Sequence, residues 1–563
     1  MENFANKRIN VLVVIFLILT LCFGYRLFSK QIVEHAGYLA QAQNQYIVKQ
    51  DLPATRGKIY ANDMYPLATN TRDYAVNVVP RQIPDKEKQN VAEKLASVID
   101  LSSEEIFNKI NNDKYYIPPL VKHLTEEQGD EIAQKKIKGV TVVPENIRFY
   151  PEGQLASQIL GFVDASGEGK YGLEGYYNEE LKGISGEIFG SKDTRGRIFD
   201  IGSKVTAHDG ESLILSLDRN IQYQAENILS KSVEKYEADS GSMIVMEPKT
   251  GKILAIANSP TFDPNAYNKV KAEDQWLFNN PAISSAWEPG SIFKPLIMAA
   301  AIQEGKIQPE TKNTFGASVQ VDGYKIETST QEAYGEETMT QVLENSDNVA
   351  MVWISELLGK DTMFEYIKDF GFGRKSGVEL DTESSGDVAD PKKWSNAQRA
   401  TISFGQGITA TPLQILAATS AIANEGNLMK PYIVEKIINA NKEDVREPKQ
   451  ITQVLKADTA KKMTEMLVSV VVNGHGKRAA VEGYDVAGKT GTAQVPKPGG
   501  GYYKDRHIGS FVGFAPADNP KFSMLVRLNN PKNVEWAESS AAPTFGEMAK
   551  WLLDYLHVPA KAN

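Results

Sequence analysis

The first residues in the chain that could do chemistry are Ser291-Ile292-Phe293-Lys294, which place an alcohol and an amine three positions apart. On a helix, residues three apart lie on neighbouring points of one face. If that face is buried, desolvation and a nearby cation lower the lysine pKa, and the neutral amine can then take the serine proton. Pro289-Gly290 would start the helix and leave Ser291 near the positive end of its dipole. The segment therefore predicts a serine nucleophile beside an amine base.

The spacing alone is a weak signal, because it recurs at Ser232-Val233-Glu234-Lys235. That copy lies in a charged stretch with Lys231 and Glu237, which is typical of a solvated helix face. Residues 291–303 are apolar and rich in alanine instead, which predicts a buried helix. The apolar setting favours the copy at 291.

A second candidate is Ser346-Asp347-Asn348. These residue types favour turns and helix caps, and taken alone the segment is best interpreted as a cap. The functional interpretation is a second hydroxyl that relays a proton, next to an amide that binds a substrate carbonyl. The sequence leaves both interpretations open at this point.

The tripeptide Lys-[Ser/Thr]-Gly occurs three times, in different settings. The copy at 249–251 falls in a predicted hairpin turn, and the copy at 375–377 falls in a glycine-rich loop. Lys489-Thr490-Gly491-Thr492 lies within a strand pattern. A strand edge with a cation, hydroxyls and free backbone amides can bind a carboxylate and supply an oxyanion donor. The last copy is therefore the candidate binding strand.

The same segment also fits a phosphate-binding loop, because residues 483–490 match G-x-x-x-x-G-K-[ST] in full. Such a loop must follow a strand and open a helix, whose first amides hold the phosphates. Here a polar stretch precedes the pattern, and residues 491–501 contain two prolines. The sequence therefore predicts no nucleotide site.

Strands before and after a helical middle surround these motifs. We predict strands at 212–217, 242–247, 252–258, 484–495, 507–515 and 522–528, and a terminal helix at 544–556. This order predicts one α/β (α+β) catalytic domain over residues 206–558. Residues 45–205 are expected to form a separate, mostly β accessory domain.

The amino-terminal region contains a strongly apolar run, VLVVIFLILTLCFGY at 11–25. Counted from Ile9, it gives about 26 Å of helix, which is short but sufficient for a membrane core. A cleaved signal is disfavoured, because the nearest Ala-x-Ala, at 40–42, lies far downstream. We predict a cytoplasmic tail at 1–8 and an uncleaved anchor at 9–26. The flanking basic residues weakly favour placing the remainder outside the cytoplasm.

Composition excludes other classes of function. The chain has 563 residues, 42% of them apolar, which is enough for sizeable cores. Its 71 acidic and 62 basic residues give a net charge of −9, which argues against nucleic-acid binding. The single cysteine, Cys22, excludes a disulfide framework, and the six histidines show no metal-ligand spacing. We expect neither a metal nor another cofactor.

The three motifs, 55 and then 143 residues apart, resemble those of the penicillin-binding proteins, the active-site serine acyltransferases of cell-wall synthesis. The likeness extends to Glu288-Pro289-Gly290-Ser291, to Phe293-Lys294-Pro295 and to TISFGQG at 401–407 with TPLQ at 411–414. Upstream, RGKIY at 56–60, RFYP at 148–151 and LEGY at 173–176 resemble the non-catalytic pedestal of the class B branch. The resemblance implies a serine β-lactamase-like transpeptidase domain, a dimerisation-type pedestal at 45–205 and a single membrane anchor with both domains extracytoplasmic.

The resemblance also implies D,D-transpeptidase chemistry on peptidoglycan stem peptides. Ser291 would attack the penultimate D-alanine carbonyl of a donor and form an acyl-enzyme. Lys294 would act as the base, Ser346 would relay the proton to the leaving amine, and Lys489 would support this relay.

The same likeness implies the substrate contacts. Asn348 would hold the donor backbone, and Thr490, Gly491 and Thr492 would form the strand that binds the terminal carboxylate. The amides of Ser291 and Thr492 would form the oxyanion hole. An amino group of an acceptor stem peptide completes the cross-link, and β-lactams would trap Ser291. A membrane glycosyltransferase is the expected partner.

Several alternatives share these motifs. A D,D-carboxypeptidase or a β-lactamase would hydrolyse its acyl-enzyme, and a β-lactam sensor or a silent scaffold would not turn over. The pedestal and anchor favour a synthetic enzyme, and the pedestal-like segment disfavours a bifunctional enzyme with its own glycosyltransferase. Septal, elongation and sporulation enzymes share the motifs. We expect the septal type from the overall length and from the absence of a carboxy-terminal extension.

Overall fold

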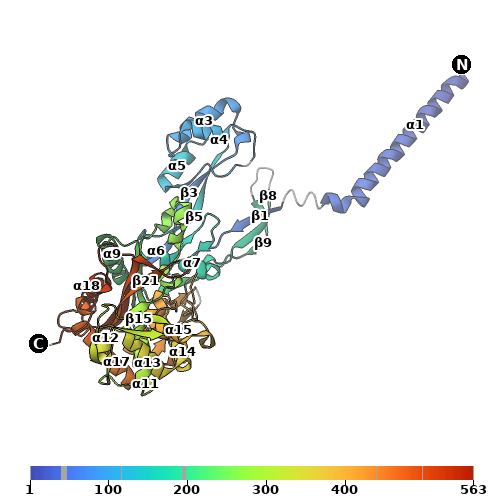
Figure 1. The fold of residues 1–563 in the computed structure, drawn as a ribbon. Helices are drawn as coiled ribbons and strands as arrows, with labels where there is room; N and C mark the ends of the chain where they lie inside the picture. The colour runs from blue at the N-terminus through green and yellow to red at the C-terminus, as the bar shows by residue number, and fades with distance from the viewer. Residues whose placement is uncertain are drawn as a thin grey trace. The chain divides into compact units, whose positions relative to one another are not determined.

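A computed structural model describes residues 2–39, 47–115, 117–192, 198–439, 442–497 and 499–561. The chain forms two compact units, Met1–Thr55 with Gly183–Gly210, and Arg56–Lys182 with Glu211–Asn563. Figure 1 shows the elements of each unit.

The first unit contains the apolar amino-terminal helix and a small sheet. Helix α1 (Glu2–Phe28) runs into a π-helical turn at Ser29–Val33. Among the described residues, the stretch Asn6–Val33 is the one helix long and apolar enough to cross a membrane, and an 18-residue window within it has a mean hydropathy of 2.5. The stretch extends beyond the predicted 9–26 span because flanking polar residues continue the helix. The sheet has the antiparallel order β1 (Ile47–Leu52), β8 (Gly186–Lys192), β9 (Ile198–Val205).

A five-stranded antiparallel sheet is the centre of the second unit. Its order is β12 (Ile253–Ser259), β11 (Ser240–Met246), β23 (Phe522–Asn529), β22 (Tyr502–Ala515) and β21 (Ala487–Pro496). The predicted hairpin at 242–258 and the three predicted late strands are thus confirmed. Because β21 lies at the edge of the sheet, the outer side of the Lys489–Thr492 segment is open to a ligand.

Helices cover both faces of this sheet. Helix α16 (Pro412–Ala423) contacts β11, β22 and β23 on one face. Helices α9 (Arg219–Lys235) and α18 (Ala541–Tyr555) contact the strands on the opposite face, so each face has its own hydrophobic core. Successive strand residues alternate between the two cores, since Ile244 packs on the α16 side and Met243 on the α9 and α18 side. The predicted terminal helix at 544–556 is α18.

A group of helices lies beside the β21 edge. Its central member, α11 (Lys294–Gln303), is buried from Lys294 to Ile302 and contacts α13 (Asn348–Leu358), α14 (Lys360–Asp369) and α17 (Ala457–Val472). Helix α12 (Met339–Glu344) packs on α17, and α15 (Asn396–Ile402) packs on α13. A helix that is apolar all round must be buried on every side, which explains the central place of α11.

Residues 56–182 contribute most of a seven-stranded sheet. It has the order β19 (Glu443–Val445), β18 (Val434–Ile438), β10 (Ser212–Leu215), β2 (Ile59–Tyr60), β3 (Pro66–Val78), β4 (Val121–Leu124), and β5 (Val140–Phe149) also pairs with β3. Helices α3 (Lys88–Ala96), α4 (Ser103–Ile110) and α5 (Glu126–Gln134) form a small core of their own with β3 and β4. The sequence predicted a mostly β accessory domain here, and the structure contains these three helices in addition to the strands.

The remaining described strands and α-helices are short. They are the ribbons β6 (Phe162–Val163) with β7 (Gly169–Lys170), β13 (Lys312–Phe315) with β16 (Gly335–Thr338), β14 (Ser318–Val321) with β15 (Tyr324–Glu327), and β17 (Asn427–Met429) with β20 (Gln450–Gln453), and the helices α6 (Ser157–Leu160), α7 (Gly172–Tyr176), α8 (Asn178–Lys182) and α10 (Pro281–Ser284).

Candidate active site

Ser291 lies on a tight 3-10 turn, Gly290–Phe293, that leads directly into α11. The α-helix itself begins at Lys294, three residues later than the predicted start, with Pro295 in its first turn, where a missing N–H costs no hydrogen bond. Gly290 has φ +61° and donates its N–H to the Gly405 carbonyl at 3.0 Å. A Cβ on Gly405 would lie 2.2 Å from the Gly290 carbonyl oxygen, so only glycine allows this turn to support the serine.

The Lys294 amine lies at the centre of the site. Its Nζ is 2.6 Å from the Ser346 carbonyl oxygen, 3.1 Å from Ser346 Oγ and 2.8 Å from Asn348 Oδ1. These partners are 52 and 54 residues away along the chain. The first and second predicted motifs are therefore joined by direct contacts.

Burial decides the protonation of this amine. Lys294 is fully buried, and desolvation lowers its pKa well below the ordinary value, with a further lowering from the nearby Lys489 cation. The Asp347 carboxylate opposes this shift. The buried amine that the sequence hypothesis required is therefore present.

The segment Ser346-Asp347-Asn348 satisfies both interpretations left open by the sequence. Asp347 caps α13, because its carboxylate accepts hydrogen bonds from the backbone N–H groups of Val349 at 2.6 Å and Ala350 at 3.2 Å. Ser346, at φ +55°, turns its hydroxyl and carbonyl toward Lys294. The Asn348 amide is held by a 3.0 Å bond from Nδ2 to the Glu327 carbonyl. The cap fixes the two flanking side chains that face the site.

Strand β21 brings the third motif to the same place. Lys489 is fully buried, and burial lowers its pKa to about 7, while Glu538 opposes the shift. Its Nζ lies 3.1 Å from the Thr490 carbonyl oxygen. A Cβ on Gly491 would lie 2.9 Å from Ile292 Cγ2, so glycine lets the strand approach the Gly290–Phe293 turn closely. The strand assignment also rules out a phosphate loop, because Lys489 lies inside β21, which continues to Pro496 where a phosphate loop would open a helix.

The duplicate motifs lie elsewhere. Lys249 is in the turn between β11 and β12, where its Nζ binds Asn519, and the Ser376 hydroxyl binds the Glu383 carboxylate in its loop. Ser232 corrects the sequence interpretation, because it is buried on α9 and accepts a 3.0 Å hydrogen bond from the Thr544 hydroxyl of α18. The charged neighbours of Ser232 face outward, but the serine itself lies on the inner face of the helix. It contributes to packing and lies outside the site.

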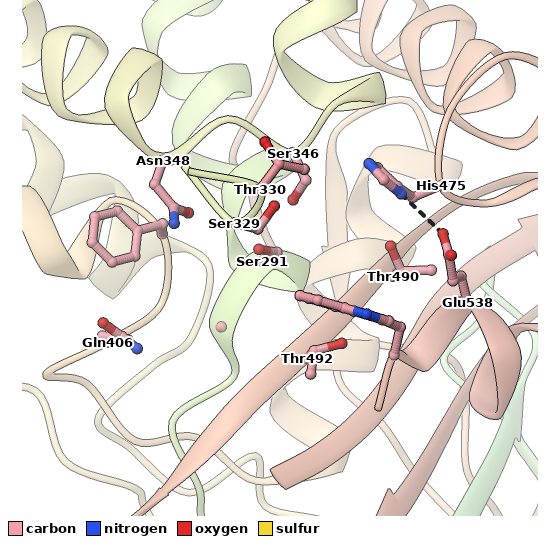
Figure 2. Close-up of a pocket in the computed structure, with 13 residues that line it drawn as sticks. Ser291, Ser329, Thr330, Ser346, Asn348, Gln406, His475, Thr490, Thr492 and Glu538 are labelled. Carbon is pink, nitrogen blue, oxygen red and sulfur yellow. Dashed lines mark hydrogen bonds and ion pairs between the residues drawn. The ribbon is translucent and has the colours of Figure 1, made fainter. Parts of the chain in front are cut away.

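A cavity of about 330 Å³ unites the three motifs (Figure 2). Its lining is dominated by hydroxyl, amide and aromatic side chains, contributed by Gly290, Ser291, Ser329, Thr330, Ser346, Asn348, Phe404, Gln406, His475, Thr490, Thr492, Trp536 and Glu538. Phe404 and Gln406 come from the TISFGQG run. Ser329, Thr330, His475, Trp536 and Glu538 were missed, because they lie in connecting segments without periodicity or motif spacing. The geometry is that of a serine with a buried amine and a hydroxyl-rich pocket.

Comparison with known proteins agrees with this geometry. Residues 241–550 match the family model described as Penicillin binding protein transpeptidase domain, and residues 51–215 match that of the Penicillin-binding Protein dimerisation domain. The chain is 35% identical over 561 residues to Stage V sporulation protein D of Bacillus subtilis (strain 168), which covers 98% of this chain and 85% of the relative. This chain belongs to the class B penicillin-binding proteins.

Further relatives of this class B penicillin-binding protein share the same architecture. Peptidoglycan D,D-transpeptidase FtsI of Escherichia coli (strain K12) is 28% identical, over 91% of this chain and 86% of the relative. The crystal structure of penicillin binding protein 3 of Mycobacterium tuberculosis complexed with aztreonam aligns with a TM-score of 0.71 at 28% identity, over 91% of this chain and 98% of that one. The predicted fold class is confirmed, and the protein is a serine-type D-Ala-D-Ala transpeptidase.

Proposed function

We propose that Ser291 is the nucleophile of this transpeptidase and that Lys294 is its base. Ser291 Oγ attacks the penultimate D-alanine carbonyl of a donor stem peptide, and its proton passes to Lys294 Nζ. As the terminal D-alanine leaves, Ser346 delivers the proton to the leaving amine, with Lys489 supporting the relay electrostatically. An amino group of a second stem peptide then attacks the acyl-enzyme and forms the cross-link.

The contacts of Lys294 are the observation that carries this proposal. A neutral amine has two hydrogens to donate and one lone pair that accepts. Two of its three neighbours, the Ser346 carbonyl and Asn348 Oδ1, can only accept. The third, the Ser346 hydroxyl at 3.1 Å, accepts from Nζ and, as a hydroxyl, can also donate. The contacts therefore tie the Lys294 amine to the second motif, within one hydrogen bond of the hydroxyl that the proposed proton relay requires.

The substrate contacts follow from the lining of the cavity. Asn348 holds the donor backbone, and the hydroxyls of Thr490 and Thr492 on the sheet edge bind the terminal carboxylate. Gly491 keeps β21 close to Ile292, so that the amides of Ser291 and Thr492 can form an oxyanion hole. β-Lactams, which imitate the D-Ala-D-Ala end, acylate Ser291.

Intact-mass measurement with benzylpenicillin tests the assignment of the nucleophile. The full chain, kept in detergent micelles, is expected to gain one stable adduct, and the Ser291→Ala variant none. Ser232→Ala is the matched control, because it alters the other serine of the same spacing, and it is expected to acylate like wild type. An adduct on folded Ser291→Ala contradicts the assignment. An adduct that forms and quickly disappears favours a hydrolytic relative.

We further propose the organisation that the sequence suggested. Residues 1–8 form a cytoplasmic tail, 9–26 the anchor, 45–205 the pedestal and 206–558 the transpeptidase domain, with both domains outside the cell membrane. The extracytoplasmic substrate supports this orientation. A separate membrane glycosyltransferase supplies the glycan strands.

For the cellular role we propose septal cross-linking, as part of cell division. Sporulation is a second candidate with support of its own, since the relative from Bacillus subtilis is named Stage V sporulation protein D. Depletion of the protein in growing cells distinguishes them. Filaments without septa support the septal role, whereas normal growth with defective spores supports the sporulation role.

A further inference from the structure

The cavity contains an acid–imidazole pair that the proposed steps do not use. His475 Nδ1 lies 2.9 Å from Glu538 Oε2, and both side chains are about two-fifths exposed, 40% and 39%. His475 follows α17, and Glu538 lies on the 3-10 turn Ala537–Ser539. Figure 2 shows the pair at the wall of the cavity, on the same side as Thr490.

Both members are fixed to the catalytic elements. The His475 N–H donates to the Glu344 carbonyl at 3.3 Å, which ties it to the end of α12, just before Ser346. The N–H of Ala537, the residue before Glu538, donates to Thr492 Oγ1 at 3.1 Å. The pair therefore bridges the second and third motifs across the cavity.

The charge of this pair sets it apart from the rest of the lining. Among the thirteen described residues that line the cavity, Glu538 is the one carboxylate and His475 the one imidazole. A carboxylate here does not help a donor whose own terminal carboxylate must bind at Thr490 and Thr492, because like charges repel. It suits a cation, and the transpeptidase reaction has one substrate that arrives as a cation. That substrate is the acceptor amine, since an alkylamine is an ammonium ion near neutral pH.

The position of the pair also agrees with the direction from which an acceptor must come. A larger groove of about 780 Å³ continues from the cavity past Tyr503 and Arg506 and shares six lining residues with it, namely Ser329, Asn348, Phe404, Gln406, Thr492 and Trp536. His475 and Glu538 do not line that groove. They line the cavity, at the end where Thr490 lies. The departing D-alanine leaves from the end where its carboxylate is held, and the acceptor nitrogen takes the place of the departed nitrogen. The incoming amine therefore approaches Glu538.

We propose that Glu538 binds the ammonium group of the acceptor stem peptide and that His475 is the positioning residue that holds the Glu538 carboxylate in place. The proposal rests on the transpeptidase steps described above. The docked ammonium gives one proton to the water that reaches this half-exposed pair. Its nitrogen then forms the C–N bond as the C–Oγ bond to Ser291 breaks, and the second proton passes through the Ser346 relay to Ser291 Oγ.

The test uses the full chain in detergent with a D-alanyl thioester donor, whose released thiol reports acylation independently of any acceptor. Two amines then compete with water for the acyl-enzyme at about pH 8, where the ε-amine of Nα-acetyl-lysine is charged and hydroxylamine is neutral. The measured quantity is the ratio of aminolysis to hydrolysis for each amine. Dividing one ratio by the other removes any change in acylation itself.

Glu538→Gln is expected to lower the acetyl-lysine ratio about fivefold relative to the hydroxylamine ratio, which is what the loss of one partly exposed ion pair produces. His475→Ala is expected to lower it less, and His475→Asn, which keeps a donor beside the carboxylate, is expected to restore it. Glu547→Gln removes an exposed carboxylate from α18 and serves as the matched control.

Equal changes for both amines, or no change for either, in folded Glu538→Gln overturn the proposal and leave the pair a structural link between His475 and the Glu538 turn. A wild-type protein that releases no thiol contradicts the proposed catalytic function instead. The two failures are therefore distinguishable.

Discussion

Two groups of buried charges in the unit formed by residues 56–182 and 211–563 are stabilised in opposite ways. In the pedestal segment, Glu174 is fully buried between two arginines, with Arg56 Nε at 2.7 Å and Arg148 Nε at 2.6 Å from its oxygens. In the active site, Lys294 and Lys489 are equally buried, but their hydrogen bonds go to neutral oxygens. One group matches cations with a carboxylate, and the other does not.

This difference explains why one group of buried charges holds segments together while the other contains lysines that lose their protons readily. Guanidinium groups suit buried ion pairs, because they are weakly hydrated and bind carboxylates with fixed geometry. The arginine cluster therefore holds RGKIY, RFYP and LEGY together, three segments up to 118 residues apart. A buried lysine without a matched carboxylate instead loses its proton readily. In the proposed mechanism, the lack of a hydrogen-bonded carboxylate is what lets the buried Lys294 act as a base.

The largest expected effect comes from placing a permanent positive charge at Lys294, the proposed base. Lys294→Arg keeps a cation that does not act as a base, and Lys294→Met removes the nitrogen. Both are expected to slow acylation by benzylpenicillin about a thousandfold, the usual contribution of a general base. Stopped-flow or mass-resolved acylation measures this rate. Lys235→Arg, in the second Ser-x-x-Lys segment, is the control, and a folded Lys294→Arg within tenfold of wild type contradicts the role of the base.

Removing the carboxylate from the matched group tests the other side of the comparison. Glu174→Gln leaves two buried guanidinium groups without their partner, which is expected to lower the free energy of unfolding by about 3 kcal/mol. Glu179→Gln breaks an exposed pair with Lys182 and is expected to leave the free energy of unfolding nearly unchanged, because exposed ion pairs contribute little to stability. Denaturant titration measures both. A Glu174→Gln protein as stable as Glu179→Gln shows that the cluster does not hold the pedestal segments.

The pH dependence of stability should carry the signature of a buried lysine. The pKa of Lys489 is lowered to about 7 in the folded protein, so between about pH 7 and 10 the unfolded chain holds more protons at this residue. The free energy of unfolding therefore rises with pH across this window. Lys489→Met is expected to remove about 2 kcal/mol of the increase between about pH 7 and 9. An unchanged slope in denaturant titrations at the two pH values indicates that Lys489 stays charged when buried.

The smallest expected effect concerns the approach of β21 to the nucleophile turn. Gly491→Ala places a methyl group 2.9 Å from Ile292 Cγ2 and Ser510 Oγ, so the strand or the turn must shift. Acylation is expected to slow about tenfold, as geometric misplacement near a reacting centre does. Gly316→Ala, whose added Cβ meets only the Ser318 carbonyl at 3.7 Å, is the control. Equal rates for the two variants contradict a positioning role for Gly491.

The local sequence predicted the elements that carry the motifs. The apolar stretch after Ser291 predicts a helix buried on all sides, and α11 is one. The alternation around Lys489 predicts a strand, and the prolines that follow exclude a helix, which is why the phosphate-loop hypothesis fails in the structure as it did in the sequence. The start of α11 was predicted three residues early, because propensity does not distinguish a 3-10 turn from the first turn of an α-helix.

Only the tertiary structure decided which motifs meet and which charges are matched. Ser232-x-x-Lys235 and Ser291-x-x-Lys294 have the same spacing, yet only the second brings its lysine to Ser346 and Asn348. Local periodicity contains no information on contacts between residues more than fifty positions apart, so neither these contacts nor the His475–Glu538 pair has a sequence signal. Burial, which sets the pKa of Lys294 and Lys489, is likewise a property of the packed core. The residue types determined which chemistry was available, and the packing of distant segments determined where it occurs.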